Sequence, residues 1–348
     1  MNLKINIDQS RDLGLDLVRA IALILMINVH FVKLIPAIGI IPEIIILFGE
    51  AAPVFFFFAF GITLDLFLKK NFDVKIIKIV LFFFVALSHN IYTCYFWNFK
   101  HGTVIITEFL FFLWLWQLII LIIESHNKKS NFFYTSLVII ILFAVTIIKP
   151  DTLESVFQNI IKGPFALIPW GVFVISGLVF NRSELLKKQK NTIIISLFII
   201  FTIIHFYKVN ILSGISLTNI TKWPLSISFI IIFGPLPFIV IIIFNNKFIK
   251  LKMHRLTFLI KGIQFLSKNL LLATVSHYLI YLLPFKIHPF IYKPEFINKH
   301  PIRMMISGSI LIVIMLFIIL FIILKIWSFI KTLYLLRLLR RHFFFFAT

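Results

Sequence analysis

The stretch LGLDLVRAIALILMINVHFVKLI, residues 13–35, is long and apolar enough to cross a bilayer, yet it contains Asp16, Arg19 and His30. Ionisable side chains are costly inside a membrane, so we take them as markers of a functional site. Arg19 and His30 are separated by three helical turns plus roughly 20°, which places them on one face, about 16 Å apart along the axis. Asp16 belongs to the same stripe. This stretch therefore predicts a membrane helix with a polar, functional face.

A structural interpretation of the same three residues stays open. Arg19 would extend to the cytoplasmic headgroups with Asp16 as its partner, and His30 would be a hydrogen-bonded packing residue near the opposite interface. Three such residues on one stripe favour the functional interpretation.

The composition of the chain excludes a soluble domain. Of 348 residues 61% are hydrophobic and 44 are Phe, which is typical of an all-α polytopic membrane protein. The net charge of +21 comes mainly from basic residues in short connections, where they orient the helices and meet anionic lipid, so no nucleic-acid partner is expected. Cys94 is the single cysteine, which excludes an internal disulfide and a cysteine-based metal cluster. No metal is expected, and the first span is expected to act as an uncleaved membrane signal.

Apolar runs long enough to cross about 30 Å of hydrocarbon occur at about ten places. They lie near residues 13–35, 44–68, 76–97, 103–123, 131–148, 160–180, 191–206, 224–244, 262–284 and 304–330. Counted over alternate connections, 22 Lys and Arg residues fall on one side and 10 on the other. This asymmetry predicts cytoplasmic termini. Because no linker or repeat interrupts the pattern, we expect one integral membrane domain over residues 1–348.

Polar residues also occur in the second and third runs. Glu50 precedes Pro53, which is expected near a helix start, and is either a solvated loop carboxylate or a substrate contact. Lys75 and Lys78 are one turn apart at the cytoplasmic interface, a spacing suited to lipid headgroups or to another phosphate. His89 lies deep in the third run, where a packing role and a substrate-binding role are both open.

The sixth and ninth runs have their own signals. In the sixth, a broken or a closely packed helix around a cavity is permitted by Pro164, Pro169, Gly171 and Gly177, and small residues also pack helices without any ligand. The ninth carries Lys268, Asn269 and His277. On a regular helix Lys268 and His277 would face different neighbours, whereas Asn269 and His277 would lie about 80° apart.

In the first run, ten residues separate Arg19 from His30. This pattern resembles the opening helix of the membrane acyltransferase superfamily. Leu15 to Arg19 is similar to its L-D-x-x-R-G opening, with Ala20 in place of glycine. Three later stretches resemble bacterial relatives of heparan-alpha-glucosaminide N-acetyltransferase in the same order. They are AAPVFFFFAFG at 51–61, IPWGVFVISG at 168–177 and SKNLLLATVSH at 267–277. Lys75 and Lys78 also resemble the R-x-x-R of the acyltransferase-3 family, a close alternative.

The resemblance implies that an acetyl or other small acyl group moves from a coenzyme A thioester to a hydroxyl or amine of a cell-envelope glycan or lipid-linked sugar. His30 would be the base or acyl carrier, oriented by Asp16, His277 or Glu50. Residues expected to bind the acyl-CoA donor are Arg19, Lys75, Lys78, Lys268 and Asn269. Glu50 and His89 are expected to bind the acceptor.

The same resemblance implies a multi-pass protein of the bacterial inner membrane, with membrane lipids as partners and homo-oligomerisation left open. A transporter or flippase is the alternative, with Asp16 and His30 as proton-relay groups. Inverted repeats would favour that alternative, and the sequence shows none.

Overall fold

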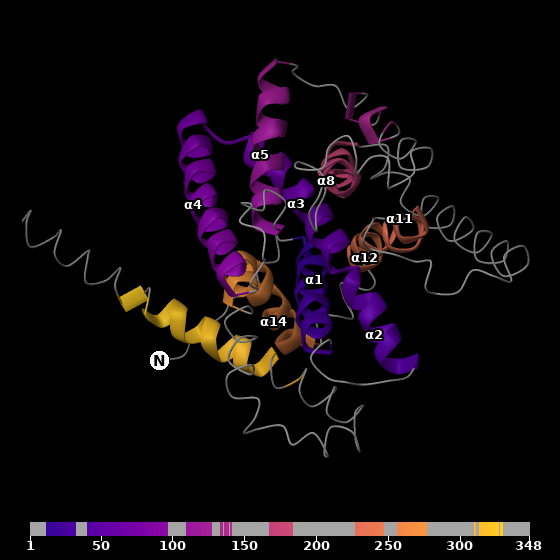
Figure 1. Ribbon diagram of the computed structural model, residues 1–348, viewed down its shortest axis with the longest axis vertical. Helices are drawn as coiled ribbons and strands as arrows, with labels where there is room; N and C mark the ends of the chain where they lie inside the picture. Colours follow the sequence, from indigo (N-terminus) through magenta and orange to yellow (C-terminus); the bar gives the residue numbers. More distant parts are fainter. Residues whose placement is uncertain are drawn as a thin grey trace, which may run out of the picture. The chain divides into compact units, whose positions relative to one another are not determined.

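The computed structural model describes residues 12–32, 40–96, 109–126, 133–134, 136–138, 140, 167–183, 227–246, 256–276, 310, 313–326 and 328–329. The regular elements of these residues are helical, which confirms the predicted all-α class for this part of the chain (Figure 1). The helices are α1 (Leu13–Val32), α2 (Ile40–Glu50), α3 (Ala52–Leu68), α4 (Phe72–Phe96), α5 (Phe109–His126), α8 (Leu167–Arg182), α11 (Ile227–Phe233), α12 (Leu236–Phe244) and α14 (Thr257–Lys268).

Three stretches among the described residues are long and apolar enough to cross a membrane: Leu13–His30, Ile45–Leu68 and Phe72–Ile91. They correspond to the first three predicted runs. Shorter apolar helices, at Phe109–Ser125, Trp170–Arg182 and Val313–Ile326, fall in three later runs. The predicted run at 191–206 lies outside the described residues. The number ten and the cytoplasmic termini therefore stay predictions.

The ninth predicted run differs from the straight helix assumed for it. Thr257–Lys268 and Leu270–Ser276 form a pair bent by 78°, which counts as a fourth span only if the pair is one broken span. At the break, the Asn269 side-chain amide donates to the Phe265 carbonyl at 2.9 Å. A side chain that competes for a helix carbonyl favours such a bend. The angles expected between Lys268, Asn269 and His277 on a regular helix therefore do not apply.

The chain divides into two compact units. The first comprises residues 1–22 and 51–264, and the second comprises residues 23–50 and 265–348. The first part of α1 thus belongs to the first unit and the rest of α1 to the second. That residues 1–348 are one domain remains a prediction.

The core of the first unit is the packing of α3 against α8. A Cβ atom added to Gly61 would collide with the Val174 carbonyl oxygen, and one added to Gly177 would collide with the Phe58 carbonyl oxygen. The two helices therefore touch backbone to backbone, each through its own glycine. This confirms the close packing predicted from the small residues of the sixth run.

Aromatic side chains attach further helices to α3. Phe57 lies 4.4 Å from Phe112 of α5, and Phe58 lies 4.2 Å from Phe238 of α12, measured between ring centroids. Pro53 lies in the first turn of α3, as expected, where its missing N–H leaves no helical hydrogen bond unmade. These contacts bury most of α3.

In the second unit, α2 meets the last turns of α1. A Cβ atom on Gly49 would lie 3.2 Å from the Leu25 carbonyl oxygen. Elsewhere in this unit Phe265 stacks on Phe317, with 5.6 Å between centroids.

Candidate functional site

The start of α1 is held by the end of α12. The Asp12 carboxylate accepts a hydrogen bond from the Leu15 N–H at 2.9 Å, which caps α1. Asn245 donates to the same Asp12 oxygen at 2.8 Å and accepts from the Gly14 N–H at 3.1 Å. A Cβ atom on Gly14 would lie 2.8 Å from the backbone of Ile241. Asn245 thus satisfies an N–H that a helix start leaves unpaired and fixes the register of α1.

One turn further along α1, two predicted site residues lie together. Asp16 is buried, and one of its oxygens lies 3.7 Å from Nη1 of Arg19. Arg19 donates through Nη2 to the Thr63 hydroxyl at 2.7 Å, and that hydroxyl donates to the Ala59 carbonyl at 2.6 Å. The guanidinium therefore joins α1 to α3, and its side chain is only 14% exposed.

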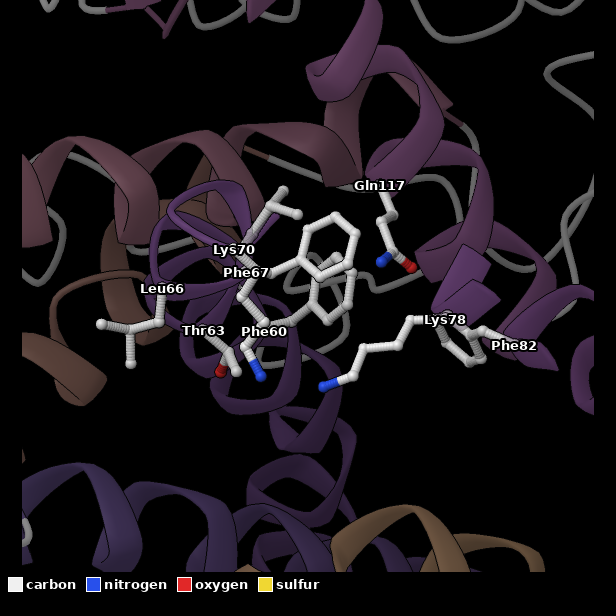
Figure 2. A pocket seen from close by; sticks show the side chains of 9 residues that line it. Phe60, Thr63, Leu66, Phe67, Lys70, Lys78, Phe82 and Gln117 are labelled. Atoms are coloured by element: carbon white, nitrogen blue, oxygen red, sulfur yellow. The ribbon is translucent and has the colours of Figure 1, made fainter. Parts of the chain in front are cut away.

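Thr63 also lines a cavity of about 390 Å³ between α3, α4 and α5 (Figure 2). Its lining residues are Phe60, Thr63, Leu64, Leu66, Phe67, Lys70, Lys78, Phe82 and Gln117. Lys70 follows α3 and Lys78 belongs to α4, and Figure 2 shows both amino groups directed into the same space. The described lining contains these two cations and no carboxylate, both lysines are exposed to solvent, and the rest of the lining is mostly apolar.

The structure thus brings two predicted donor-binding residues to one place. Lys78 lines the cavity, and Arg19 contacts its wall through Thr63. Lys75 lies one turn before Lys78 on α4 and is not among the described lining residues. His89 is buried near the far end of α4, beside the buried Asn90.

The other predicted site residues lie elsewhere. His30 lies in the last turn of α1, and Glu50 ends α2; both are half-buried and belong to the second unit. Lys268 is exposed at the end of α14, and Asn269 follows it at the bend. His277 lies outside the described residues. The roles assigned to these residues stay predictions.

A buried ionic network at the end of α3 was not predicted from the sequence. The Asp65 carboxylate lies 2.7 Å from Nε of Arg182 and 2.9 Å from Nζ of Lys69, and it accepts a hydrogen bond from Asn181 at 2.8 Å. The i to i+4 spacing of Asp65 and Lys69 was the one local signal for it. Arg182 lies at the end of an apolar run, where a basic residue is expected simply to orient the helix in the membrane.

The network continues to α5. Nη1 of Arg182 lies 2.7 Å from the Glu124 carboxylate, which also accepts a hydrogen bond from the Tyr134 hydroxyl at 2.6 Å. The guanidinium lies 5.5 Å from the centroid of the Tyr134 ring. Two carboxylates and two cations therefore balance one another and tie α3, α5 and α8 together. Asp65 itself contacts α8 and Lys69.

Comparison with known proteins gives a match to one family model. Residues 11–197 match the family model for heparan-alpha-glucosaminide N-acetyltransferase, catalytic, while no curated protein and no solved structure matches the chain. Three of the four resembling stretches lie inside the match, which covers more than half of the chain. Among the described residues, no cluster of three or more His, Cys, Asp or Glu side chains is placed to hold a metal. The chain belongs to the heparan-alpha-glucosaminide N-acetyltransferase catalytic family, a family of membrane acetyltransferases.

Proposed function

We propose that this protein transfers an acetyl or other small acyl group from a coenzyme A thioester to a hydroxyl or amine of a cell-envelope glycan or lipid-linked sugar, in the bacterial inner membrane. The observation that carries the proposal is the position of Arg19. Arg19 is the arginine of the pattern in which ten residues separate an arginine from a histidine, and it donates a hydrogen bond to Thr63 in the wall of a cavity that two lysines also line. The class of reaction, acyl transfer, is inferred from membership of the family.

In this proposal the donor is held by its negative charges. Arg19, Lys75 and Lys78 provide positive charge near the predicted cytoplasmic side, where coenzyme A thioesters are available. The buried Asp16 keeps Arg19 oriented, because the ion pair lies largely out of water. Lys268 and Asn269 are assigned to the donor from the resemblance alone.

The chemistry is assigned to His30. As base, its imidazole takes the proton from the acceptor hydroxyl or amine, whose oxygen or nitrogen attacks the thioester carbonyl. The carbon–sulfur bond then breaks, and the coenzyme A thiolate leaves and recovers a proton. In the covalent variant the imidazole itself takes the acyl group first and passes it to the acceptor. His277 would orient the imidazole, and Glu50 and His89 would contact the acceptor. Asp16 lies about 21 Å before His30 along the axis of α1, so its role is to hold Arg19 and not to orient the imidazole.

Arg19 and His30 are part of one continuous helix. Their separation of about 16 Å along the axis, at 1.5 Å per residue, is comparable to the length of an extended pantetheine arm. Phosphates near Arg19 and a thioester near His30 are therefore compatible with one bound donor molecule.

The test compares the wild type with His30→Ala. Purified protein is incubated with radiolabelled acetyl-coenzyme A and membrane lipid extract, and the label is followed into protein and into lipid-linked glycan. We expect loss of transfer by about 10²- to 10⁴-fold in His30→Ala, the usual contribution of a general base. His126→Ala, at the end of α5, is the matched control and is expected to retain transfer. An active, folded His30→Ala variant would contradict the assignment.

A further inference from the structure

We infer that Asn245, at the end of α12, is a positioning residue for the proposed acyl transfer, and that it holds the start of α1 in the register that brings Arg19 to α3. The inference rests on the proposed function and goes beyond it, because it adds a residue with no assigned part in binding or chemistry. Asn245 lies outside the stretch that matches the family model, and sequence patterns did not assign it.

The proposed reaction depends on where α1 lies along its own axis. Arg19, assigned to the donor, and His30, assigned to the chemistry, belong to this one continuous helix. A slip of one residue would move both by about 1.5 Å along the axis and by about 100° around it. Apolar side chains resist such a slip only weakly in a membrane, because lipid and protein offer them similar contacts. Polar contacts and close backbone packing therefore have to fix the register.

Asn245 supplies polar contacts to α1 through both ends of its amide. Its Oδ1 accepts a hydrogen bond from the Gly14 N–H at 3.1 Å, and its Nδ2 donates to the Asp12 carboxylate at 2.8 Å. The same Asp12 oxygen accepts a hydrogen bond from the Leu15 N–H at 2.9 Å. A side-chain amide offers both an acceptor and a donor, whereas a carboxylate lacks the donor and an aliphatic side chain lacks both. The chemistry of residue 245 therefore matters, and not only its size.

Close backbone packing occurs at the same place. A Cβ atom on Gly14 would lie 2.8 Å from both the Cα atom and the carbonyl oxygen of Ile241, one turn before Asn245. The backbones of α1 and α12 therefore approach each other directly, which keeps Asn245 within hydrogen-bond reach of the first turn of α1. The side chain of Asn245 is half-buried there, whereas the next residue, Asn246, is exposed.

The contact between α1 and α12 completes a closed frame of three helices in the first unit. Further along α1, Nη2 of Arg19 donates to the Thr63 hydroxyl of α3 at 2.7 Å. Helix α3 in turn packs on α12, where the ring centroids of Phe58 and Phe238 lie 4.2 Å apart. Because α12 is fixed on α3, Asn245 determines where along α3 the guanidinium falls. The hydrogen bond between Arg19 and Thr63 therefore depends on a residue of a third helix.

The first experiment tests this dependence without turnover. Melting temperatures in a neutral detergent are measured for Asn245→Leu, for Thr63→Val and for the double variant, and Asn246→Ala replaces Asn245→Leu in the matched control. Sites on different helices normally contribute additively. We expect Thr63→Val to lower the melting temperature at most about half as much in the Asn245→Leu background, where Arg19 is already displaced, and undiminished in the control background. Additive losses for Asn245→Leu and Thr63→Val would overturn the inference.

A charge swap covers the case in which Asn245→Leu does not fold. Asn245→Asp keeps the acceptor for the Gly14 N–H but places a second carboxylate against Asp12. Adding Asp12→Asn returns a donor and an acceptor with their roles exchanged. We expect Asn245→Asp to lower the melting temperature and the swapped double variant to recover most of the loss. A double variant no more stable than Asn245→Asp would overturn the inference, because the contact would then not hold α1.

The kinetic experiment separates positioning from stability. KM and kcat for acetyl-coenzyme A are measured for the wild type, Asn245→Asp, the swapped double variant and Ile120→Ala, at a temperature where all four are folded. Ile120→Ala is the control for stability, because it opens a cavity at a fully buried position of α5. A less stable protein has fewer active molecules, which lowers kcat and leaves KM unchanged. A displaced Arg19 weakens donor binding and raises KM.

We expect Asn245→Asp to raise the KM for acetyl-coenzyme A about tenfold, equivalent to about 1.4 kcal/mol, and the swapped double variant to return most of the way to the wild type. Ile120→Ala is expected to leave KM unchanged. A lower melting temperature with unaltered KM in Asn245→Asp would make the contact merely structural and overturn the inference, while transfer by the wild type would still support the proposed function. A wild type that transfers no acetyl group contradicts the proposed function, and the coupling of Asn245 to Thr63 then decides by itself whether Asn245 positions Arg19.

Discussion

Helices α3 and α4 are consecutive apolar helices with very different surroundings. In the stretch Ile45–Leu68, which includes α3, 67% of the most apolar window is buried inside the protein, against 22% for Phe72–Ile91 in α4. Both are rich in phenylalanine, so hydrophobicity does not separate them. In a membrane, an apolar side chain gains little free energy by exchanging contact with lipid for contact with protein. Close packing and polar contacts therefore determine which helix is enclosed.

The residues of the two helices account for the difference. In α3, Gly61 admits the backbone of α8, and Thr63 and Asp65 bind Arg19 and Arg182. In α4 most of the exposed side chains are large and apolar, and these suit contact with lipid. Examples are Ile76, Ile77, Val80, Leu81 and Phe84. The cavity lies where the enclosed α3 and the more exposed α4 meet α5.

The largest expected effect comes from breaking the glycine contact of α3. Gly61→Leu would place a side chain in the space occupied by the Val174 carbonyl, and backbone atoms cannot rotate away. We expect a loss well above the about 1–3 kcal/mol typical of overpacking, seen as failure to fold or a greatly lowered melting temperature in micelles. Gly262→Leu on α14 is the control, because a Cβ atom there meets nothing within 4 Å. Equal melting temperatures for the two variants would refute the packing argument.

Removing the cation at the centre of the ionic network is expected to cost about 3–5 kcal/mol. Arg182→Met leaves the buried Asp65 and the half-buried Glu124 without their shared partner. Lys69→Met removes the other cation, whose side chain is 66% exposed, and is expected to cost at most about 1 kcal/mol. Denaturant unfolding of both variants measures the difference. A loss for Lys69→Met as large as that for Arg182→Met would mean that burial does not govern this network.

A matched pair of isoleucines gives the smallest effect and the sharpest comparison. Ile62 of α3 is 5% exposed, and Ile77 of α4 is 58% exposed. We expect Ile62→Ala to cost about 2–5 kcal/mol through lost packing, and Ile77→Ala to stay within about 0.5 kcal/mol. Thermal unfolding in lipid nanodiscs checks both. A large loss for Ile77→Ala would show that α4 contacts protein rather than lipid on that face.

Part of the candidate site was predictable from local patterns. Arg19 and Asp16 stood out because charges in an apolar run are rare, and Lys78 stood out by its spacing from Lys75. Lys70 and Gln117 gave no such signal. A lysine in a short basic connection and a glutamine in an apolar helix are each unremarkable until folding brings them to one cavity.

By itself, the sequence determined that this is a helical membrane protein, where three of its spans lie, and to which family it belongs, because these depend on hydropathy over windows and on short ordered motifs. Only the tertiary structure decided that α3 is enclosed while α4 faces outward, that Asp65 is joined to Arg182 and Glu124, and that Lys70 and Lys78 share a cavity. Those relations join residues from different helices. These relations depend on which backbones approach closely and on where buried charges find partners. Neither can be deduced from the local order of side chains.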